Sequence, residues 1–291
     1  MPTMPTNADT GFLLGYGGWA SMQMRSGDGA GSRTGGRKSA KIYLSCTGAE
    51  YSRAHTAPLL RSLSAPWDTE NRAPIRIGFG VWNYTGSVDF ELDDAAAGIL
   101  LTDEFFYRRS FLDFELCDGE ALLKIPGAVW DSATITAAPG KLVTGSLSFS
   151  SCNGYESEIK PENATHPKPD FGELQPYWSY GAEGVEHFTL NFTRDVSPVY
   201  LNEHKWCGPT YLRVGNLSVK MDITCWQKWF DHRSVRLGKR KIEFGENSFQ
   251  AARAYRFNGP EEAAKTYTLT AVADKNTNPL FTLSNYTRGR H

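Results

Sequence analysis

The chain has 291 residues, a formal net charge of −1 and 13% aromatic residues. That length allows one large domain or two of ordinary size, and the aromatic content is sufficient for a packed core. The near-neutral charge excludes a global basic field of the kind that attracts nucleic acid. No apolar run is long enough to cross a bilayer, and residues 11–20 lack the basic start and the apolar stretch of a signal peptide. We therefore expect neither membrane insertion nor Sec export.

Residues 1–40 are predicted to form a flexible N-terminal arm. The segment Gly27–Lys38 is rich in glycine and polar residues and cannot bury enough apolar surface to fold alone. A short apolar piece around Phe12 and Trp19 precedes it and is a candidate for docking elsewhere.

From Lys41 onward, apolar and polar residues alternate with the period of a β-strand. Val88, Phe90 and Leu92 alternate with acidic residues, and Pro139 with Gly140 predicts a hairpin turn between two alternating segments. One helix is expected over Ala95–Leu101, capped by Asp93 or Asp94.

Sequence landmarks of residues 41–150 recur in the same order in the second half of the chain. Ser87–Leu92 is echoed by Ser218–Ile223 at an offset of 219 − 88 = 131, and Leu112–Glu115 by Ile242–Phe244 at 242 − 112 = 130. Further echoes pair Arg53 with Arg194 and Thr144–Ser148 with Thr266–Thr270. These repeats predict a tandem duplication. Strands that merely share the same alternation remain the alternative.

The repeats divide the chain into an arm over 1–40, a first β unit over 41–150, a linker over 151–180, a second β unit over 181–273 and a C-terminal tail over 274–291. The linker is polar and rich in proline, as interdomain segments are. The helix of the second unit is expected over Trp226–Leu237.

Several of these segments resemble the tail tube proteins of tailed bacteriophages. In the first half, the resemblance lies in Gly86–Leu92, the helix that follows, Phe111–Gly119 and the hairpin that ends with Val143–Phe149. In the second half, Gly208–Val219, Phe257–Lys265 and Tyr267–Ala271 look like the second copy found in double-domain tube proteins. The resemblance covers roughly residues 41–273.

The resemblance implies an all-β fold with minor α, in which two tandem sandwich- or barrel-like units each carry a flanking helix. It implies rings of six units, hence of three such chains, stacked into a tube through which DNA leaves the capsid. The implied partners are further copies of the chain, terminator, tape measure, and baseplate or distal tail proteins. The place of action would be the virion, after assembly in the host cytoplasm, and no cofactor is implied. The same fold also builds baseplate hub and distal tail rings, which remain an alternative.

A channel for DNA should repel phosphate or ignore it, because a basic lining would bind DNA through counterion release. The candidate lumen residues are Asp89, Glu91, Asp93, Asp113 and Glu115. The matching positions of the second half include Lys220 and Asp222, so an acidic lining would be uneven. An ordinary solvated sheet face is the alternative interpretation.

Contacts between subunits are predicted from opposite charges near the two expected helices. The first half carries Asp94, Asp103 and Glu104, and the second carries Arg233, Arg236, Lys239 and Arg240. Alternating acidic and basic units would favour unlike neighbours around a ring. Loop tryptophans Trp67 and Trp206 are candidate anchors to a neighbouring ring. Solvated charge runs, and tryptophans folded onto their own core, remain the alternatives.

Catalytic and metal-binding interpretations have little support in the sequence. The chain has no nucleophile elbow, phosphate loop or zinc-protease motif. His204 and Cys207 are the one ligand-like pair, and accidental spacing explains them better than a metal site. The five cysteines are an odd, widely spaced set that predicts no disulfide framework. We expect no enzyme, and keep a glycan-binding or glycan-cleaving β-sandwich as the alternative of another class.

Overall fold

The computed structural model describes sixteen segments of the chain and shows a fold built mainly of β-strands. The described residues are 9–13, 18–26, 37–56, 59–60, 76–77, 81–107, 110–118, 121–138, 140–158, 185–201, 208–225, 234–237, 240–245, 249–259, 262–271 and 281–285. Within them, two short helices accompany the strands. The predicted all-β class with minor α is confirmed at this level.

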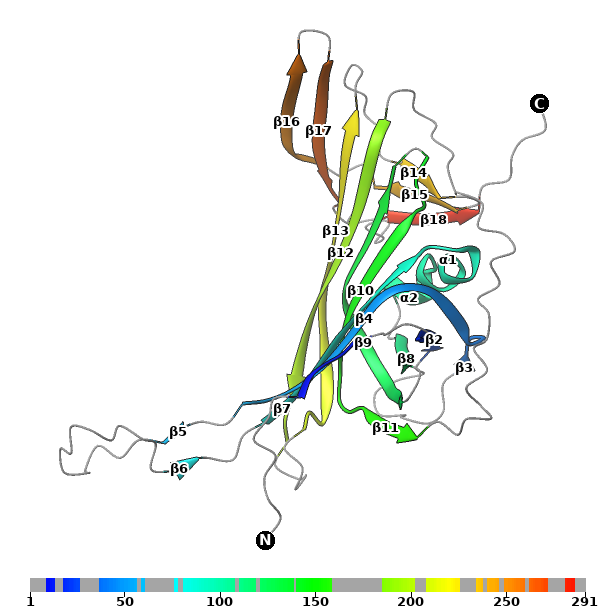
Figure 1. The fold of residues 1–291 in the computed structure, drawn as a ribbon. Coiled ribbons are helices and arrows are strands. Elements are labelled where there is room, and N and C mark those ends of the chain that lie inside the picture. Colours follow the sequence, from blue (N-terminus) through cyan, green and yellow to red (C-terminus); the bar gives the residue numbers. More distant parts are fainter. Residues whose placement is uncertain are drawn as a thin grey trace, which may run out of the picture.

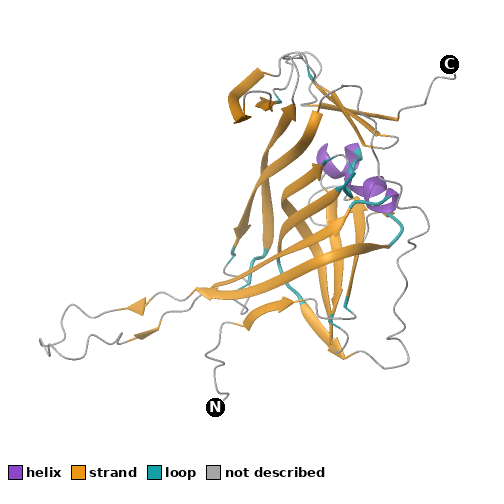
Figure 2. Ribbon diagram, turned by 45° about the horizontal axis from the view of Figure 1, so that its top comes forward, coloured by secondary structure: helices purple, strands orange, loops and turns teal. Residues whose placement is uncertain are grey.

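A closed antiparallel barrel forms the first half of the fold (Figures 1 and 2). Its six strands in the described residues are, in pairing order, β2 (Trp19–Ser26), β4 (Ile42–Thr56), β7 (Val81–Glu91), β10 (Thr144–Ser151), β9 (Ala121–Ala137) and β8 (Ser110–Cys117). β8 also pairs with β2, so the circuit returns to its first strand. Closure leaves these strands paired on both edges for part of their length, which removes the unpaired edge of an open sheet.

The N-terminal strand β2 was not expected from the sequence. The sequence predicts a flexible arm over residues 1–40, but β2 lies within that range and its Ala20 and Met22 are fully buried. Its apolar residues alternate with polar ones, and the glycine-rich stretch that follows conceals this pattern in the composition of the arm. The arm prediction therefore does not hold for Trp19–Ser26.

β9 is the strand at which the barrel meets the second half. β10 runs along one edge of β9. On the other edge, β8 pairs with Leu122–Ala128, and β12 (Val185–Val199) takes over from Ser132 to Ala137. The sheet therefore continues from the barrel into the second half without a break.

The second half is an open sheet with a smaller sheet beside it. The open sheet continues from β12 through β13 (Tyr211–Cys225) and β17 (Glu262–Thr270) to β16 (Phe249–Gly259). The smaller sheet consists of β14 (Ser234–Leu237), β15 (Arg240–Phe244) and β18 (Phe281–Asn285). The remaining strands are β1 (Asp9–Leu13), β3 (Arg37–Lys38), β5 (Leu59–Leu60), β6 (Arg76–Ile77) and β11 (Tyr155–Glu158). β11 and β18 lie within the predicted linker and tail, respectively.

The first-half helix is confirmed, with Asp93 as its cap. The Asp93 carboxylate accepts a hydrogen bond from the backbone N–H of Ala96 at 2.7 Å, and α1 spans Asp94–Leu100. A second helix, α2 (Asp103–Tyr107), was not predicted. In the second half, the helix prediction is wrong for Ser234–Leu237, which form β14 and bury alternate residues against β15. Residues 226–233 of that prediction lie outside the described residues.

One hydrophobic core joins both halves. The ring of Phe106 in α2 lies 4.6 Å from that of Phe192 in β12 and 5.0 Å from that of Phe281 in β18, between centroids. We call the continuous run of strands β4, β7, β10, β9, β12, β13, β17 and β16 the large sheet. Figure 1 shows the two helices and the smaller sheet on the same side of it. The opposite face of the large sheet carries neither the helices nor the smaller sheet.

Candidate functional site: a hydroxyl-rich sheet face

Short hydroxyl side chains cover the solvent-facing side of the large sheet. The strand registers align them in three rows that cross β7, β10, β9, β12, β13 and, in two rows, β17. The rows are Glu91, Thr144, Thr136, Thr189, Asp222 and Thr268; Asp89, Ser146, Thr134, Asn191, Lys220 and Thr270; and Ser87, Ser148, Ser132, Thr193 and Ser218. We call this set the hydroxyl face. It crosses from the barrel into the second half at the β9–β12 junction.

The alternation of strands explains why the hydroxyl face forms. Side chains at successive strand positions point to opposite faces, so a polar residue on one face lies next to an apolar residue on the other. Buried neighbours of the rows are Val88, Phe90, Leu147, Ala133, Ile135, Leu190, Phe192, Val219 and Met221. The same strands therefore supply both the core and the hydroxyl face.

Hydrogen bonds run across the strands in the centre of the hydroxyl face. The Thr134 hydroxyl donates to the Asn191 side-chain oxygen at 3.2 Å, and the Asn191 amide donates to Asp222 at 3.2 Å. Asp222 also accepts from the Thr268 hydroxyl. These bonds link side chains of β9, β12, β13 and β17 across the strands.

The charge of the hydroxyl face is small and negative. Its charged members are Asp89, Glu91, Asp222 and Lys220, and three carboxylates with one ammonium leave −2. Asp89 and Lys220 are exposed, whereas Glu91 and Asp222 are partly buried. Such a surface offers a phosphate chain little attraction and weak repulsion.

The five carboxylates predicted to line a lumen occupy three different environments. Asp89 and Glu91 lie on the hydroxyl face, while Asp93 caps α1. Asp113 forms an ion pair with Arg25 and accepts the backbone N–H of Gly127 at 2.8 Å, and Glu115 forms an ion pair with Lys41. The strand β8 that carries Asp113 and Glu115 is separated from β7 by β2 and β4. The structure thus keeps two of the five together on the large sheet.

The sequence predictions for the lumen named only carboxylate residues and did not include the hydroxyl side chains that surround them. The signal was present, because Thr144, Ser146 and Ser148 alternate with apolar residues along one predicted strand. Ser132, Thr134 and Thr136 do the same on β9. What the sequence could not give is the register that aligns these strands.

The predicted subunit contacts are only partly within the described residues. Asp94 and Asp103 are exposed at the starts of α1 and α2, and Glu104 follows in α2. Arg236 and Arg240 belong to β14 and β15. Trp67, Trp206, Arg233 and Lys239 lie outside the described residues. Figure 1 places the elements that carry these residues, α1, α2, β14 and β15, on the same side of the large sheet.

A buried arginine connects the two halves beneath the hydroxyl face. Arg194 of β12 is 7% exposed, and its guanidinium carbon lies 4.1 Å from the centroid of the Trp130 ring. Its Nη2 donates to the backbone carbonyls of Phe105, at 3.4 Å, and Phe106. Burial lowers the pKa of Arg194 to about 10, so it remains charged at neutral pH. The contact is therefore structural and fastens α2 to β12.

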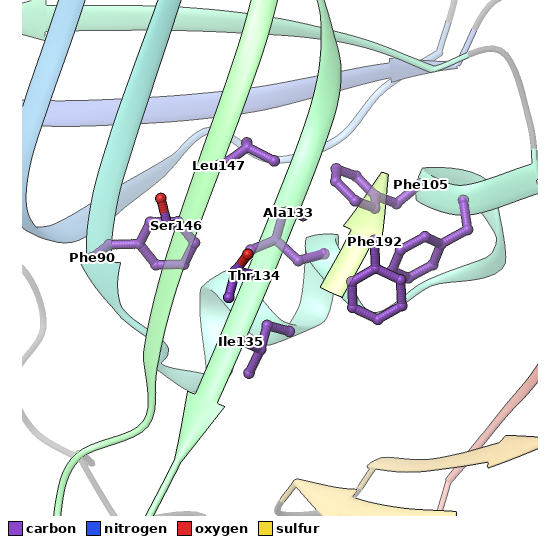
Figure 3. Close-up of a pocket in the computed structure, with 10 residues that line it drawn as sticks. Phe90, Phe105, Ala133, Thr134, Ile135, Ser146, Leu147 and Phe192 are labelled. Carbon is purple, nitrogen blue, oxygen red and sulfur yellow. The ribbon is translucent and has the colours of Figure 1, made fainter. Parts of the chain in front are cut away.

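The small cavity drawn in Figure 3 lies in the core behind the hydroxyl face. Aromatic and aliphatic side chains, including Phe90, Phe105, Ile135 and Phe192, line it. It has room for about one water molecule, which is far less than a ligand pocket requires. It is a packing defect of the core.

Neither a metal centre nor a membrane-spanning helix is found in the part of the chain that the structure describes. The Nε2 atom of His187 lies 3.3 Å from the hydroxyl oxygen of Thr224. His204 and Cys207 lie outside the described residues.

No model of a known protein family matches the chain, and no curated protein matches its sequence.

Proposed function

We propose that the chain is a structural protein of a bacteriophage tail, in which three copies close a ring and stacked rings form the tube for DNA. The observation that carries this proposal is the uninterrupted sheet across both halves, with a core on one face and mostly short, uncharged side chains on the other. A curved sheet of this kind supplies the wall of a channel once its ends meet. The resemblance to tail tube proteins supplies the identity of the channel.

Two tandem units are part of the proposal, and the strand orders support them. The sheet order is β4-β7-β10-β9 in the first half and β12-β13-β17-β16 in the second. Counted along the chain, the four strands of each spatial order are the first, the second, the fourth and the third. The registers also match, because Glu91 pairs with Thr144 as Asp222 pairs with Thr268. By this register Thr144 corresponds to Thr268, whereas the sequence repeat matches Thr144 with Thr266. Because side chains alternate with a period of two, this shift of two residues leaves the same side chains on the hydroxyl face.

The junction between the halves supplies a model for the junction between chains. Within the chain, β9 of the first unit pairs with β12, the first strand of the second unit. If the pattern repeats, β16 pairs with β4 of the next chain, and three chains give six such junctions. A head-to-tail contact of this kind closes a ring when its rotation fits.

The hydroxyl face suits the inside of a DNA channel. Each phosphate contact with a lysine or arginine releases counterions and strengthens binding, so a conducting wall should have few cations. Lys220 is the one cation of the three rows, and Asp89 and Asp222 lie on the same face. DNA would pass over mostly uncharged side chains, several of which are hydrogen-bonded to one another across the strands.

Electron microscopy of the purified chain tests the assembly. Long hollow tubes are the expected result. Isolated rings that do not stack would favour a baseplate hub or distal tail ring, and monomers with affinity for glycans would favour the β-sandwich alternative.

Thiol labelling tests which face lines the channel. Thr193→Cys places a thiol on the hydroxyl face, and Thr282→Cys places one on β18, with both positions exposed in the single chain. In tubes, we expect Thr193→Cys to react with a small maleimide but not with a polymer-linked one, while Thr282→Cys reacts with both. The unsubstituted protein measures the background of native cysteines. Equal labelling of both variants by the bulky reagent in tubes would place the hydroxyl face outside the channel.

A further inference from the structure

The outer edge of β4 is covered by the N-terminal part of the chain. β7 pairs with β4 along one edge, from Ser45 to Thr56. On the other edge, β2 pairs with Ile42–Leu44 and β1 with positions between Glu50 and Arg53. β1 and β2 follow one another along the same edge of β4. β8 pairs with β2 over Trp19–Ser26, so it is β2 that takes part in closing the barrel. The contribution of β1 to the barrel is therefore peripheral.

The pairing of β1 is short and irregular. The three register positions that join it to β4 are Asp9 with Arg53, Phe12 with Tyr51 and Leu13 with Glu50, and the register shifts between the first two. By contrast, β9 pairs with β12 through six consecutive positions, from Phe188 to Thr193, without a shift. An irregular pairing supplies fewer well-aligned backbone hydrogen bonds than a regular one.

The edge covered by β1 corresponds to the edge of β12 that receives β9. Glu50 of β4 pairs with Ser87 as Thr193 of β12 pairs with Ser218, so Glu50 and Thr193 are equivalent positions. Thr193 pairs with Ser132 of β9 on its other side, whereas Glu50 pairs with Leu13 of β1. β1 thus occupies the place that the neighbouring unit takes in the second half.

We propose that β1 is a removable cover of the β4 edge, which β16 of a second copy displaces when two chains join. The inference rests on the proposed function, because it names how the chain-to-chain junction is regulated. β16 is eleven residues long, and within the described residues β17 is its one pairing partner. A strand with an open edge is a template for uncontrolled pairing, and a weak cover on its acceptor slows growth until the longer strand replaces it.

Deletion of residues 1–13 tests the cover directly. The barrel strands begin at Trp19 and stay in the chain, and deletion of residues 1–8, which leaves β1, is the matched control. We expect the longer deletion to lower the critical concentration for assembly about tenfold, as the loss of roughly 1.4 kcal/mol of competing pairing would. Light scattering against protein concentration measures this, and circular dichroism checks that both variants are folded.

A disulfide that locks β1 in place provides the opposite test. Leu13→Cys with Glu50→Cys joins directly opposed positions of β1 and β4. Assembly should stop in the oxidised form and return on reduction, while each single variant assembles under both conditions. The same measurements on the unsubstituted chain exclude an effect of its native cysteines.

The outcomes separate this inference from the proposed function. Tubes from the full chain, with no change on deletion of 1–13 or on locking, would overturn the cover and leave the tail-tube proposal intact. Loss of assembly on deletion of 1–13 in a folded protein would make β1 part of the joint and would also overturn the cover. Failure of every form to assemble would overturn both. Assembly only of the chain without residues 1–13 would support both.

Discussion

The two halves of the molecule use the same strand order but differ in how their sheets end. In the first half, β2 and β8 close the sheet into a barrel. In the second half, the described strands end at β16, and the sheet stays open. The closing pair consists of β2, from the N-terminal segment, and β8, and the described strands of the second half contain no counterpart of this pair. Within the described residues, the second half is joined to the first by the β9–β12 pairing and by the shared core.

The Arg194 contact should be the most sensitive link between the halves. Arg194→Met would leave the carbonyls of Phe105 and Phe106 without this donor, and we expect unfolding to become easier by about 2 kcal/mol. The substitution also removes a buried charge, and this gain in stability offsets part of the loss from the missing hydrogen bonds. Urea unfolding of the full chain measures the effect.

Arg53 provides the matched control for that experiment. Its guanidinium carbon lies 4.0 Å from the Trp82 ring centroid, much as Arg194 lies over Trp130, but Arg53 is exposed. Arg53→Met should cost less than about 1 kcal/mol, the usual range for an exposed cation–π contact. Equal losses for the two variants would show that Arg194 contributes stacking alone and does not tie the halves together.

The sequence predicted the elements better than their connections. The alternation around Val88 and Phe90 and the turn at Gly140, which has φ of +69°, gave the strands and the β9–β10 hairpin, because these depend on neighbouring residues. The strand registers do not support the predicted equivalence of Arg53 with Arg194. When β7 is matched to β13, buried Tyr51 of β4 takes the position that Arg194 has in β12. Closure by β2 and the alignment of the hydroxyl rows depend on contacts between distant segments, and no local pattern encodes them.

The first half has a glycine, Gly86, at a β7 position where β13 of the second half carries Leu217. Tyr51 pairs with Gly86, whereas Arg194 pairs with Leu217. A Cβ at Gly86 would lie 2.5 Å from Phe149 Cζ and 2.8 Å from the carbonyl oxygen of Glu50. Gly86→Ala should therefore cost about 2 kcal/mol of stability through overpacking.

Gly98 of α1 is the control for Gly86, because a Cβ there meets no atom within 4 Å. Gly98→Ala should stabilise the protein by about 0.5–1 kcal/mol, since alanine favours the helix. Thermal unfolding of both variants measures the contrast. A Gly86→Ala protein as stable as the parent would mean that the barrel wall can yield at this point, and that closure does not depend on a small residue there.

The smallest effect is expected at Asp131, where β9 changes partner from β8 to β12. Burial raises the pKa of the Asp131 carboxyl, although the Ser150 hydroxyl donates to it at 3.2 Å. The charged form is thus less favourable in the folded chain than in the unfolded chain, and stability falls as the pH rises through the titration of this group. Asp131→Asn removes the charge and keeps an acceptor for Ser150, so it should raise the unfolding temperature slightly at neutral pH. The gain should disappear once the acid is protonated in both states, below its ordinary pKa of 3.8. If the rise in unfolding temperature persists unchanged at lower pH, it comes from packing at the junction. The change of partner on β9 from β8 to β12 would then carry no electrostatic cost.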